Sequence, residues 1–474
     1  MNPLSLPPSC AEHLAGLEQF FSVGRVRLPL ATHYRKLLAT RYNFLIRSNA
    51  TVLEVGCGEG ELLSYIDAER KVGIDLSGEQ IARGKQRFPD LDLRVGCPET
   101  GNLPREEFDV IILSDVLNYS PDVEVFLRRL TDCCHRNTRI LINIHNTLWR
   151  PLIDLARALG FSNKQPMLNW LSRQDVTNLC FLADWNVFKW LGIIICPIPL
   201  GPISNFLNRF VGPLLPSFCF SIFLVACRTG LPRRDPDTVS VVIPARNEAG
   251  SVTQAIERMP QLAPNMEVIF IEGHSKDNTW EVIQNLPDTF RFGSIIKLQQ
   301  TGKGKGNAVI EGFKAATGQI LMILDADLTV PPEDLPKFVE VLTAGKADFA
   351  NGVRLVYPMD KNAMKFANLC ANKGFSILFS WLLGQPVKDT LCGTKVLWQE
   401  DYQQIDRGRE YFGNFDPFGD FDLLFGADKQ NLRIIDVPIR YKERFYGETN
   451  IQRWKHGVIL LRMVVFAAQR LKFI

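Results

Sequence analysis

The most constraining feature of the sequence is a short apolar run that ends in two closely spaced acids, within Gln319–Asp334 (QILMILDADLTVPPED). Residues 320–324 have the length and apolar character of a buried strand. Asp325 and Asp327 follow, and alternate residues of a strand share one face. Two carboxylates so close repel unless a cation lies between them, and a divalent ion with open positions for phosphate oxygens would satisfy them. The alternative is a solvated loop with two surface acids, since short motifs recur by chance.

Composition limits the class of protein. A chain of 474 residues is expected to form two to four domains, and its 46% hydrophobic and 22% charged residues are those of globular protein. The net charge of +3 argues against a nucleic-acid partner. The 11 scattered cysteines without a C-x-x-C pair favour a reducing, cytoplasmic environment, and residues 1–19 show no signal-peptide pattern.

The first third of the chain predicts an α/β domain at 51–228, preceded by a helical lead-in at 1–50. The lead-in is either a lid over the following site or a solvated amphipathic helix. Thr51–Gly60 (TVLEVGCGEG) reads as a buried strand followed by a glycine-rich turn into a helix, where glycines let the backbone approach a ligand. A second strand ends at Asp75, a placement that lets a carboxylate grip ribose hydroxyls.

These residues resemble the class I S-adenosylmethionine-dependent methyltransferases. Glu54–Gly60 matches the family's first motif, Asp75 its ribose-binding acid, and Phe108–Tyr119 its fourth strand and following loop. The resemblance implies a Rossmann-like fold and S-adenosyl-L-methionine as cofactor, bound by Glu54, Gly56, Gly58, Asp75 and, at a looser match on the adenine side, Glu99. The open alternative is a domain of this fold that has lost cofactor binding. His145 and Asn146, expected after the fifth strand, receive no role.

Residues 191–227 are strongly apolar but interrupted by prolines and polar residues, so they do not form a membrane span. We expect the last two strands of the first sheet here, at 187–196 and 218–226. The apolar loop between them either touches a lipid surface or hydrophobic acceptor, or belongs to the core. Residues 229–238, rich in proline and charge, are the expected linker.

A second α/β domain is expected at 239–450. Its strands end in polar loops at Pro244–Glu248 (PARNE) and at Glu272–Thr279, at the carboxyl edge where open parallel sheets bind ligands. Lys303–Asn307 (KGKGN) opens a helix, and glycines and lysines beside a helix N-terminus suit a diphosphate.

These motifs resemble family 2 glycosyltransferases of the GT-A fold, from about residue 239 to 450. The resemblance implies a metal at Asp325 and Asp327, which also count as catalytic. It further implies a nucleotide-sugar site whose residues are Pro244, Arg246, Glu248, Glu272, Lys303, Asp325, Ala326, Asp327, Arg354 and Arg444.

Three later segments resemble the polyprenyl-phosphate branch of that family, which dolichyl-phosphate mannose synthase typifies. They are Lys388–Lys395, Phe421–Ala427 and Tyr441–Asn450. Asp422 is the candidate general base for a hydroxyl acceptor, while a phosphate acceptor needs none. The branch's third metal ligand, a glutamine, is Thr329 here, which leaves a two-carboxylate or water-completed site.

The last segment, residues 451–474, carries five basic residues and no acid around two apolar runs. This pattern predicts an amphipathic helix, either lying in an anionic membrane interface or docked on the second domain.

Together the motifs predict a bifunctional enzyme. A methyltransferase is joined to a Mg²⁺- or Mn²⁺-dependent inverting glycosyltransferase that moves sugar from a nucleotide sugar to a polyprenyl-phosphate or cell-surface glycan. It acts in the cytoplasm, with peripheral contact at the cytoplasmic membrane face. The alternatives are a soluble enzyme that glycosylates and methylates one polysaccharide or natural product, and a glycosyltransferase with a non-catalytic S-adenosylmethionine-binding regulatory domain.

Overall fold

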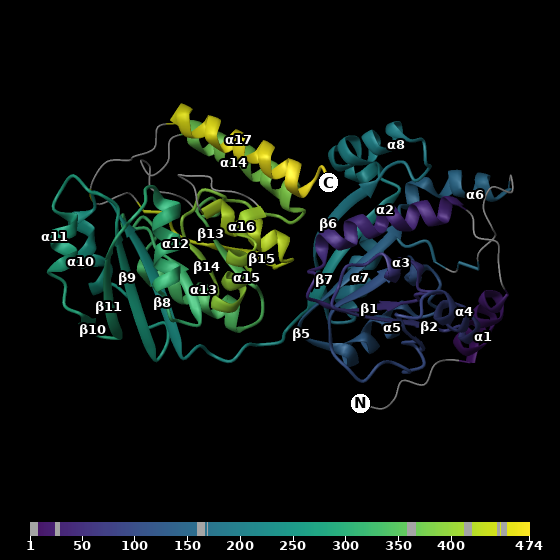
Figure 1. Cartoon of the computed structure of the whole chain (residues 1–474). Helices are drawn as coiled ribbons and strands as arrows, with labels where there is room; N and C mark the ends of the chain where they lie inside the picture. The colour runs from purple at the N-terminus through teal and green to yellow at the C-terminus, as the bar shows by residue number, and fades with distance from the viewer. Residues whose placement is uncertain are drawn as a thin grey trace. The chain divides into compact units, whose positions relative to one another are not determined.

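A computed structural model describes residues 8–23, 29–158, 166–167, 169–357, 366–411, 420–442, 446 and 453–474 (Figure 1). The chain divides into two compact units. Unit 1 comprises Met1–Thr229 with Phe473–Ile474, and unit 2 comprises Gly230–Lys472. The division falls at the start of the segment expected to be the linker. Each unit contains its own sheet, which confirms the prediction of two α/β domains.

The sheet of unit 1 has seven strands in the order β3-β2-β1-β4-β5-β7-β6. All neighbours are parallel except β7, which is antiparallel to both β5 and β6. The strand order reverses between β1 and β4, and ligands bind at such a switch point in open α/β sheets. The strands are β1 Thr51–Val55, β2 Arg70–Asp75, β3 Asp92–Val95, β4 Phe108–Ser114, β5 Cys134–His145, β6 Trp185–Ile194 and β7 Ser221–Arg228.

The helices of unit 1 flank this sheet, and the expected helix after the glycine-rich turn is only four residues long, at α3. The α-helices are α1 Pro8–Ser22, α2 Pro29–Leu45, α3 Glu61–Ser64, α4 Gly78–Arg87, α5 Val123–Arg129, α6 Arg150–Ala158, α7 Arg173–Leu182, α8 Pro202–Phe206 and α9 Gly212–Leu214. Single irregular turns are η1 Val116–Asn118, η2 Leu130–Cys133, η3 Thr147–Trp149, η4 Leu207–Val211 and η5 Pro216–Phe218.

The two strands expected from the apolar segment are present as β6 and β7, each displaced by about two residues from its predicted range. Between them the chain forms the short turns α8 to η5. Several large apolar side chains of this connection are exposed: Ile198, Leu200, Ile203, Phe206, Phe210, Leu214, Leu215 and Phe218.

The sheet of unit 2 has eight strands in the order β10-β11-β9-β8-β12-β14-β13-β15. Strand β8 is parallel to β9 and β12, whereas β14 runs antiparallel to β12 and β13. The strands are β8 Thr238–Ala245, β9 Asn265–Glu272, β10 Thr289–Phe290, β11 Gly293–Gln299, β12 Ile320–Ile323, β13 Phe349–Val353, β14 Lys395–Trp398 and β15 Ile434–Pro438.

The helices of unit 2 pack against this sheet. They are α10 Ala249–Glu257, α11 Thr279–Gln284, α12 Lys305–Ala315, α13 Leu335–Thr343, α14 Phe366–Leu383, α15 Gln399–Arg407, α16 Asp420–Lys429 and α17 Arg453–Leu471, with turns η6 Pro332–Asp334 and η7 Arg409–Tyr411.

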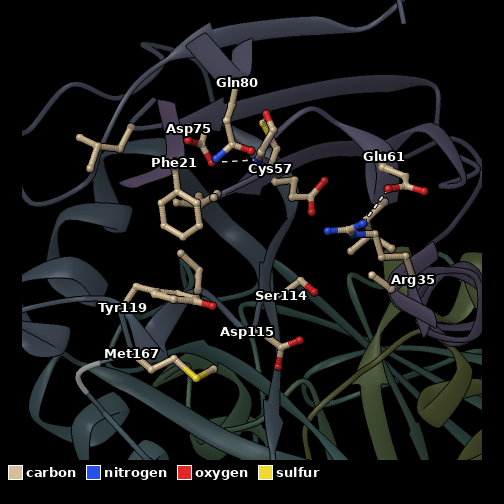
Figure 2. A pocket seen from close by; sticks show the side chains of 18 of the residues that line it. Phe21, Arg35, Cys57, Glu61, Asp75, Gln80, Ser114, Asp115, Tyr119 and Met167 are labelled. Carbon is tan, nitrogen blue, oxygen red and sulfur yellow. Dashed lines mark hydrogen bonds and ion pairs between the residues drawn. The ribbon is translucent and has the colours of Figure 1, made fainter. Parts of the chain in front are cut away.

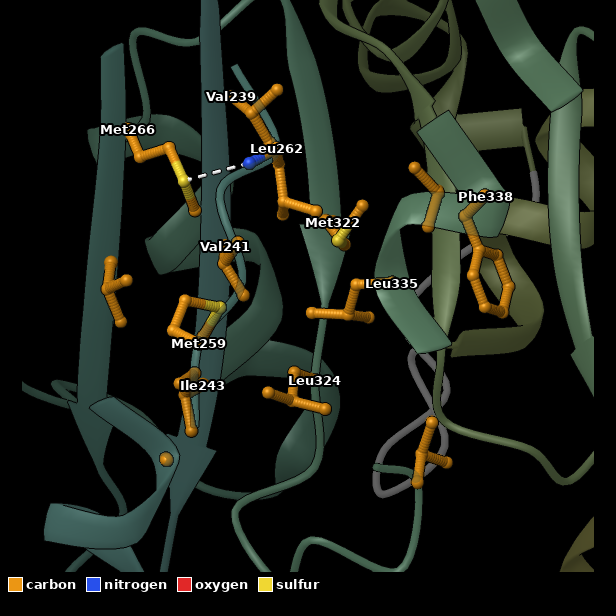
Figure 3. Close-up of a cluster of buried hydrophobic side chains, with 14 of the residues drawn as sticks. Val239, Val241, Ile243, Met259, Leu262, Met266, Met322, Leu324, Leu335 and Phe338 are labelled. Carbon is orange, nitrogen blue, oxygen red and sulfur yellow. Dashed lines mark hydrogen bonds between the residues drawn. The ribbon is translucent and has the colours of Figure 1, made fainter. Parts of the chain in front are cut away.

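The core of unit 2 anchors the strand that precedes the paired acids (Figure 3). Val241 of β8 and Met322 of β12 are fully buried, and Leu335 and Phe338 of α13 belong to the same cluster. Burial of such side chains contributes about 1.5–3 kcal/mol each. Strand β12 is therefore held firmly up to Ile323.

Helix α17 lies along α14 and has two unlike faces. Leu460, Met463 and Ala467 are buried, whereas Val458, Leu461 and Val465 are about half exposed. Among the helices that the structure describes, none combines the length and the apolar character that a bilayer crossing requires.

Candidate active sites

The glycine-rich turn of unit 1 is tied to the neighbouring strand. The backbone amides of Gly56 and Cys57 donate to the Ile74 carbonyl over 2.8 and 3.0 Å. Gly56 and Gly58 have φ values of 75° and 57°, which residues with a Cβ rarely adopt. A Cβ on Gly56 would also lie 2.6 Å from Val116 Cγ2. Both glycines are required by this turn.

Two carboxyls lie at the turn, Glu54 buried and Asp75 partly buried. Burial raises the pKa of Glu54 to about 8, although Arg35 opposes the shift, and its Oε2 has no hydrogen-bond partner among the described residues. Burial also raises the pKa of Asp75, whose carboxylate accepts hydrogen bonds from the Gly58 amide (2.8 Å) and the Ser77 amide (2.9 Å). An orphaned buried oxygen needs a donor, so Glu54 is poised to receive one from a ligand.

A cavity of about 1040 Å³ opens at this edge of the sheet (Figure 2). Asp75 and Gln80 lie at one end of the view, while Asp115 and Met167 lie at the other. Glu99 also lines the cavity and accepts hydrogen bonds from the Ser120 hydroxyl (2.8 Å) and the Cys97 thiol (3.1 Å). All five residues expected to bind the cofactor (Glu54, Gly56, Gly58, Asp75, Glu99) are therefore cavity-lining.

The N-terminal helices supply one wall of the cavity. Leu14, Leu17 and Phe21 of α1 and Tyr34 and Arg35 of α2 line it. Arg35 Nη1 lies 2.6 Å from Glu61 Oε2, and this ion pair joins α2 to the start of α3 (Figure 2). Of the two expectations for this lead-in, the described helices fit a wall over the site better than a solvated helix.

A polar cluster lies at the end of the cavity away from Asp75. Asp115 follows β4 with a left-handed φ of 54°, and its Oδ1 lies 3.0 Å from Nδ1 of His145, the last residue of β5. The Tyr34 hydroxyl lies 3.3 Å from Asp115 Oδ2 and 3.3 Å from Ser221 Oγ. The sequence assigns no role to His145 and does not single out Tyr34, because these contacts join four separate parts of the fold: α2, the turn after β4, β5 and β7.

In unit 2 the paired acids lie in a turn after β12, not on the extended strand that the sequence predicts. The backbone carbonyl of Asp325 accepts a hydrogen bond from the Leu328 amide (3.2 Å), and Leu328 has a φ of 52°. The Asp327 carboxylate accepts hydrogen bonds from the Thr329 amide (3.1 Å) and hydroxyl (2.8 Å). Alternation along a strand therefore does not orient these acids, and Thr329 braces Asp327.

Lys305, the first residue of α12, contacts the first acid, with its Nζ 2.6 Å from Asp325 Oδ1. Burial would raise the pKa of Asp325, but Lys305, with Arg354 and Lys395, holds it below the ordinary value. Gly393 lies directly over this pair, since a Cβ there would overlap both the carboxylate and the ammonium. Lys303, the expected phosphate ligand, lies two residues earlier and is exposed. The K-G-K spacing could have pointed to Lys305 as a second candidate at the same helix N-terminus.

Arg354 is bound by a second acid in this structure. Its Nε and Nη2 donate to the Asp389 carboxylate over 2.7 and 2.9 Å, and Asn372 Nδ2 adds a third contact at 3.1 Å. Asp389 is fully buried; burial would raise its pKa, but Arg354 lowers it. The segment Lys388–Lys395 thus positions Arg354 and covers Asp325 at once.

The remaining residues expected to bind the nucleotide sugar lie around the carboxyl ends of β8 and β9. Pro244 pairs in register with Ile271, Arg246 is exposed, and Glu248 and Glu272 are buried. The Glu272 carboxylate accepts a hydrogen bond from the Ser275 amide. The buried Ala326 lies between the two acids in sequence.

Two expected residues stand apart. Asp422 is buried on α16 with its Oδ2 3.4 Å from Arg409 Nη1, so its recorded neighbour is a cation of η7. Arg444 lies outside the described residues. Within the described part of the chain no group of three His, Cys, Asp or Glu residues is arranged to hold a metal ion. A metal at Asp325 and Asp327 would depend on these two carboxylates and on ligand oxygens.

Comparison with protein families assigns a class to each unit. Residues 30–189 match a family model described as a methyltransferase domain. Residues 240–405 match the model of glycosyl transferase family 2. The chain therefore joins a methyltransferase domain to a family 2 glycosyltransferase domain, as the sequence predicts.

Two characterised relatives share part of the chain. A dolichol-phosphate mannosyltransferase from Pyrococcus furiosus is 28% identical over 220 residues, 45% of this chain and 59% of the relative. A low-salt glycan biosynthesis hexosyltransferase from Haloferax volcanii is 28% identical over 237 residues, 47% of this chain and 53% of the relative. The chain thus spans between half and three fifths of the length of these relatives.

Solved structures similar to each half are also known. Glucosyl-3-phosphoglycerate synthase from Mycobacterium tuberculosis covers 50% of this chain and 80% of its own, with 18% identity and a TM-score of 0.35. An S-adenosylmethionine-dependent methyltransferase from Thermotoga maritima covers 42% of this chain and 91% of its own, with 16% identity and a TM-score of 0.31.

Proposed function

We propose that the chain is a bifunctional enzyme. Unit 2 transfers a hexose from a nucleotide sugar to a polyprenyl-phosphate or cell-surface glycan acceptor, and unit 1 transfers a methyl group from S-adenosylmethionine. The observation that carries the proposal is that, in each unit, other residues of the fold pack against the family motif and hold it in place. These are the glycine turn beside Asp75 and Glu54 in unit 1, and Lys305 and Gly393 packed on Asp325 in unit 2.

For sugar transfer the leaving group is a nucleoside diphosphate that gains negative charge as the glycosidic bond breaks. A Mg²⁺ or Mn²⁺ ion bound by Asp325 and Asp327 would supply positive charge to that diphosphate. Lys305, on the first turn of α12, lies where it can pass from Asp325 to a phosphate oxygen. Arg354 is held in position by Asp389, and Lys303 is exposed nearby in sequence. The proposed displacement is single and inverts the sugar carbon.

The acceptor determines whether unit 2 needs a base. A polyprenyl phosphate is already anionic, so cations rather than a base would serve it. A hydroxyl acceptor would need Asp422 to accept a proton. The Asp422 carboxylate is buried, with its Oδ2 3.4 Å from Arg409 Nη1. Arg444 is proposed as a further phosphate ligand on sequence grounds alone.

For methyl transfer the cavity of unit 1 fits S-adenosylmethionine. Its glycine turn lets the backbone approach a ligand, and among the residues that line the cavity Asp75 would bind the ribose hydroxyls and Glu99 the adenine. Glu54 offers a buried oxygen with no partner in the described part of the chain. S-adenosylmethionine carries cationic groups, which an acidic cavity favours.

We further propose peripheral contact with the cytoplasmic membrane face through α14 and α17. These helices contain no acid, and α17 exposes Val458, Leu461 and Val465 beside the exposed cation Arg462. Apolar side chains beside cations suit an anionic lipid surface.

A thermal-shift panel of nucleotide sugars with Mn²⁺, together with S-adenosylhomocysteine, tests both sites at once. We expect S-adenosylhomocysteine and one nucleotide-sugar class each to raise the melting temperature, since ligands that bind the native state stabilise it. A chain that responds to neither class contradicts the proposal.

Flotation with liposomes tests the membrane contact. We expect the chain to float with vesicles that contain anionic lipid, and V458E/V465E to lose flotation while it keeps its response to S-adenosylhomocysteine. A wild-type chain that stays in the soluble fraction at low salt would favour the soluble tailoring enzyme instead.

A further inference from the structure

The polar cluster at the end of the unit 1 cavity away from Asp75 is built on two adjacent parallel strands. Ser114 of β4 pairs in register with Asn143 of β5, so Asp115 and His145 leave the sheet side by side at its carboxyl edge. Both side chains are 18% exposed and both line the cavity. Neither is among the five residues expected to bind the cofactor.

The arrangement orients the imidazole. Asp115 Oδ1 lies 3.0 Å from His145 Nδ1. The contact is not aligned as a hydrogen bond, and neither atom has another hydrogen-bond partner within the described residues. Catalytic hydrogen bonds are often poorly aligned before the substrate binds. A carboxylate at Nδ1 favours the proton on that nitrogen, which leaves Nε2 with its lone pair.

The surrounding groups leave His145 as the proton acceptor. The Tyr34 hydroxyl contacts Asp115 Oδ2, and burial, reinforced by Asp115, raises the pKa of Tyr34 well above its usual value, so this phenol stays neutral. Tyr42, further along α2, is likewise held neutral by burial. The ring of Phe220 covers one side of the imidazole, with centroids 4.8 Å apart.

We propose that His145 is the general base for methyl transfer and that Asp115 is its positioning residue, an inference that rests on the proposed methyltransferase function. The acceptor is a hydroxyl. Its oxygen forms a bond to the methyl carbon of S-adenosylmethionine while the carbon–sulfur bond breaks, and sulfur keeps the electron pair. The hydroxyl proton passes to His145 Nε2 and from there to solvent. A phosphate acceptor is already anionic and would have no need of this base.

The walls of this end indicate what carries the hydroxyl. Trp149, Leu152, Ile153, Ile198 and Phe220 line the cavity here. Leu152 and Ile198 are also 56% and 51% exposed, so the mouth itself is apolar. Large exposed apolar patches on soluble proteins mark binding sites for apolar partners. The acceptor is therefore a hydroxyl on an apolar, lipid-like skeleton rather than a free saccharide.

The test uses the full chain with S-adenosylmethionine that is tritium-labelled on its methyl group. The acceptors are the total lipid extract of the source organism in detergent micelles and the matching aqueous extract. We expect label in the organic phase, in a product that survives mild base as a methyl ether does. Label only in the aqueous phase, a base-labile or amine product, or no label from a chain that binds S-adenosylmethionine would overturn the inference.

Variants separate a base from a structural residue. H145A should lower transfer about 100-fold or more, the usual contribution of a general base, and added imidazole should restore part of the rate. D115N should lower kcat with little change in KM, because an amide nitrogen that donates to Nδ1 leaves the proton on Nε2 and so removes the lone pair that the base requires. Wild-type rates in H145A, or an unrescued loss, would contradict the base role.

The chain offers a matched control. His135 Nε2 lies 3.2 Å from Asp109 Oδ1, a second His–Asp pair of the same unit that does not line the cavity. H135Q should leave transfer unchanged. Calorimetric affinity for S-adenosylhomocysteine should be the same in all variants. If the wild-type chain does not bind this ligand, the proposed methyltransferase function fails instead of the inference.

Discussion

The two sites of this chain treat their acids in opposite ways. In unit 1 burial dominates, so the pKa values of Glu54 and Asp75 lie above the ordinary range. In unit 2 cations dominate, so the pKa values of Asp325 and Asp389 lie below the ordinary range, although Asp389 is fully buried and Asp325 partly buried. A carboxyl with a raised pKa is stabilised in its ionised form when a cationic ligand binds. A carboxylate that is already paired with a lysine can exchange that lysine for a metal ion. The difference supports the proposal of a sulfonium cofactor for one site and a metal–diphosphate for the other.

The strongest way to break this comparison is to remove the acids of unit 2. D325A/D327A should lower sugar transfer about 1000-fold in the presence of Mg²⁺ or Mn²⁺, because electrostatic stabilisation of a leaving group is usually the largest catalytic contribution. The measurement is release of nucleoside diphosphate from the donor. Binding of S-adenosylhomocysteine serves as control and should not change. Intact transfer in the double variant would refute the metal role.

The corresponding change in unit 1 is G56A/G58A. Both glycines have positive φ, and a Cβ on Gly56 would overlap Val116, so the turn cannot keep its shape. We expect affinity for S-adenosylmethionine to fall about 100-fold or more by calorimetry. Gly16, which has open space around it, provides the control variant G16A. Unchanged affinity in G56A/G58A would contradict the site.

The two lysines of the K-G-K segment sharpen the comparison. Lys305 contacts Asp325, whereas Lys303 is exposed. K305A should lower sugar transfer about 10- to 100-fold and should raise the concentration of Mn²⁺ required for half-maximal rate less than D325A does. K303A should change the rate less than K305A. The opposite order would show that the contact in this structure is not the productive one.

The smallest effect concerns Glu54. Its folded-state pKa of about 8 lies above the unfolded value of about 4.3, so the folded state binds more protons between these values. Stability therefore falls as the pH rises through this window. Chemical denaturation of the wild type and of E54Q at pH 5 and pH 8 should show a smaller decrease for E54Q. Equal slopes would show that the carboxyl is not held neutral.

Local patterns predicted much of the fold. The predicted strand at 52–55 is β1, Thr51–Val55, and the run at 320–324 contains β12, Ile320–Ile323. These strands were predictable because a fully buried strand appears in the sequence as a continuous apolar run. The fold class of each domain and the order of the two domains along the chain followed from the two family resemblances. The turn at Asp325 was missed because Leu328, not a glycine, takes the left-handed conformation there.

The candidate sites were predictable only where they are local. The glycine turn and the paired acids are continuous in sequence. The clamp of Arg354 by Asp389 joins residues 35 positions apart, and His145 meets Asp115 through the pairing of β4 and β5. Such contacts depend on tertiary packing, so no spacing in the sequence announced them. The sequence therefore predicted the loops of the candidate sites, but not the long-range contacts that fix the charged side chains around them.

Gly393 has a consequence for how variation in this chain should be interpreted. It has no functional group, yet the side chain of any larger residue would overlap the Asp325 carboxylate and the Lys305 ammonium. A variant at position 393 would keep both acids of the donor motif and still lose the room they require. A search that recognises this site by its acidic residues alone would classify that variant as intact. The absence of a side chain at position 393 is therefore as informative as the presence of the two carboxylates.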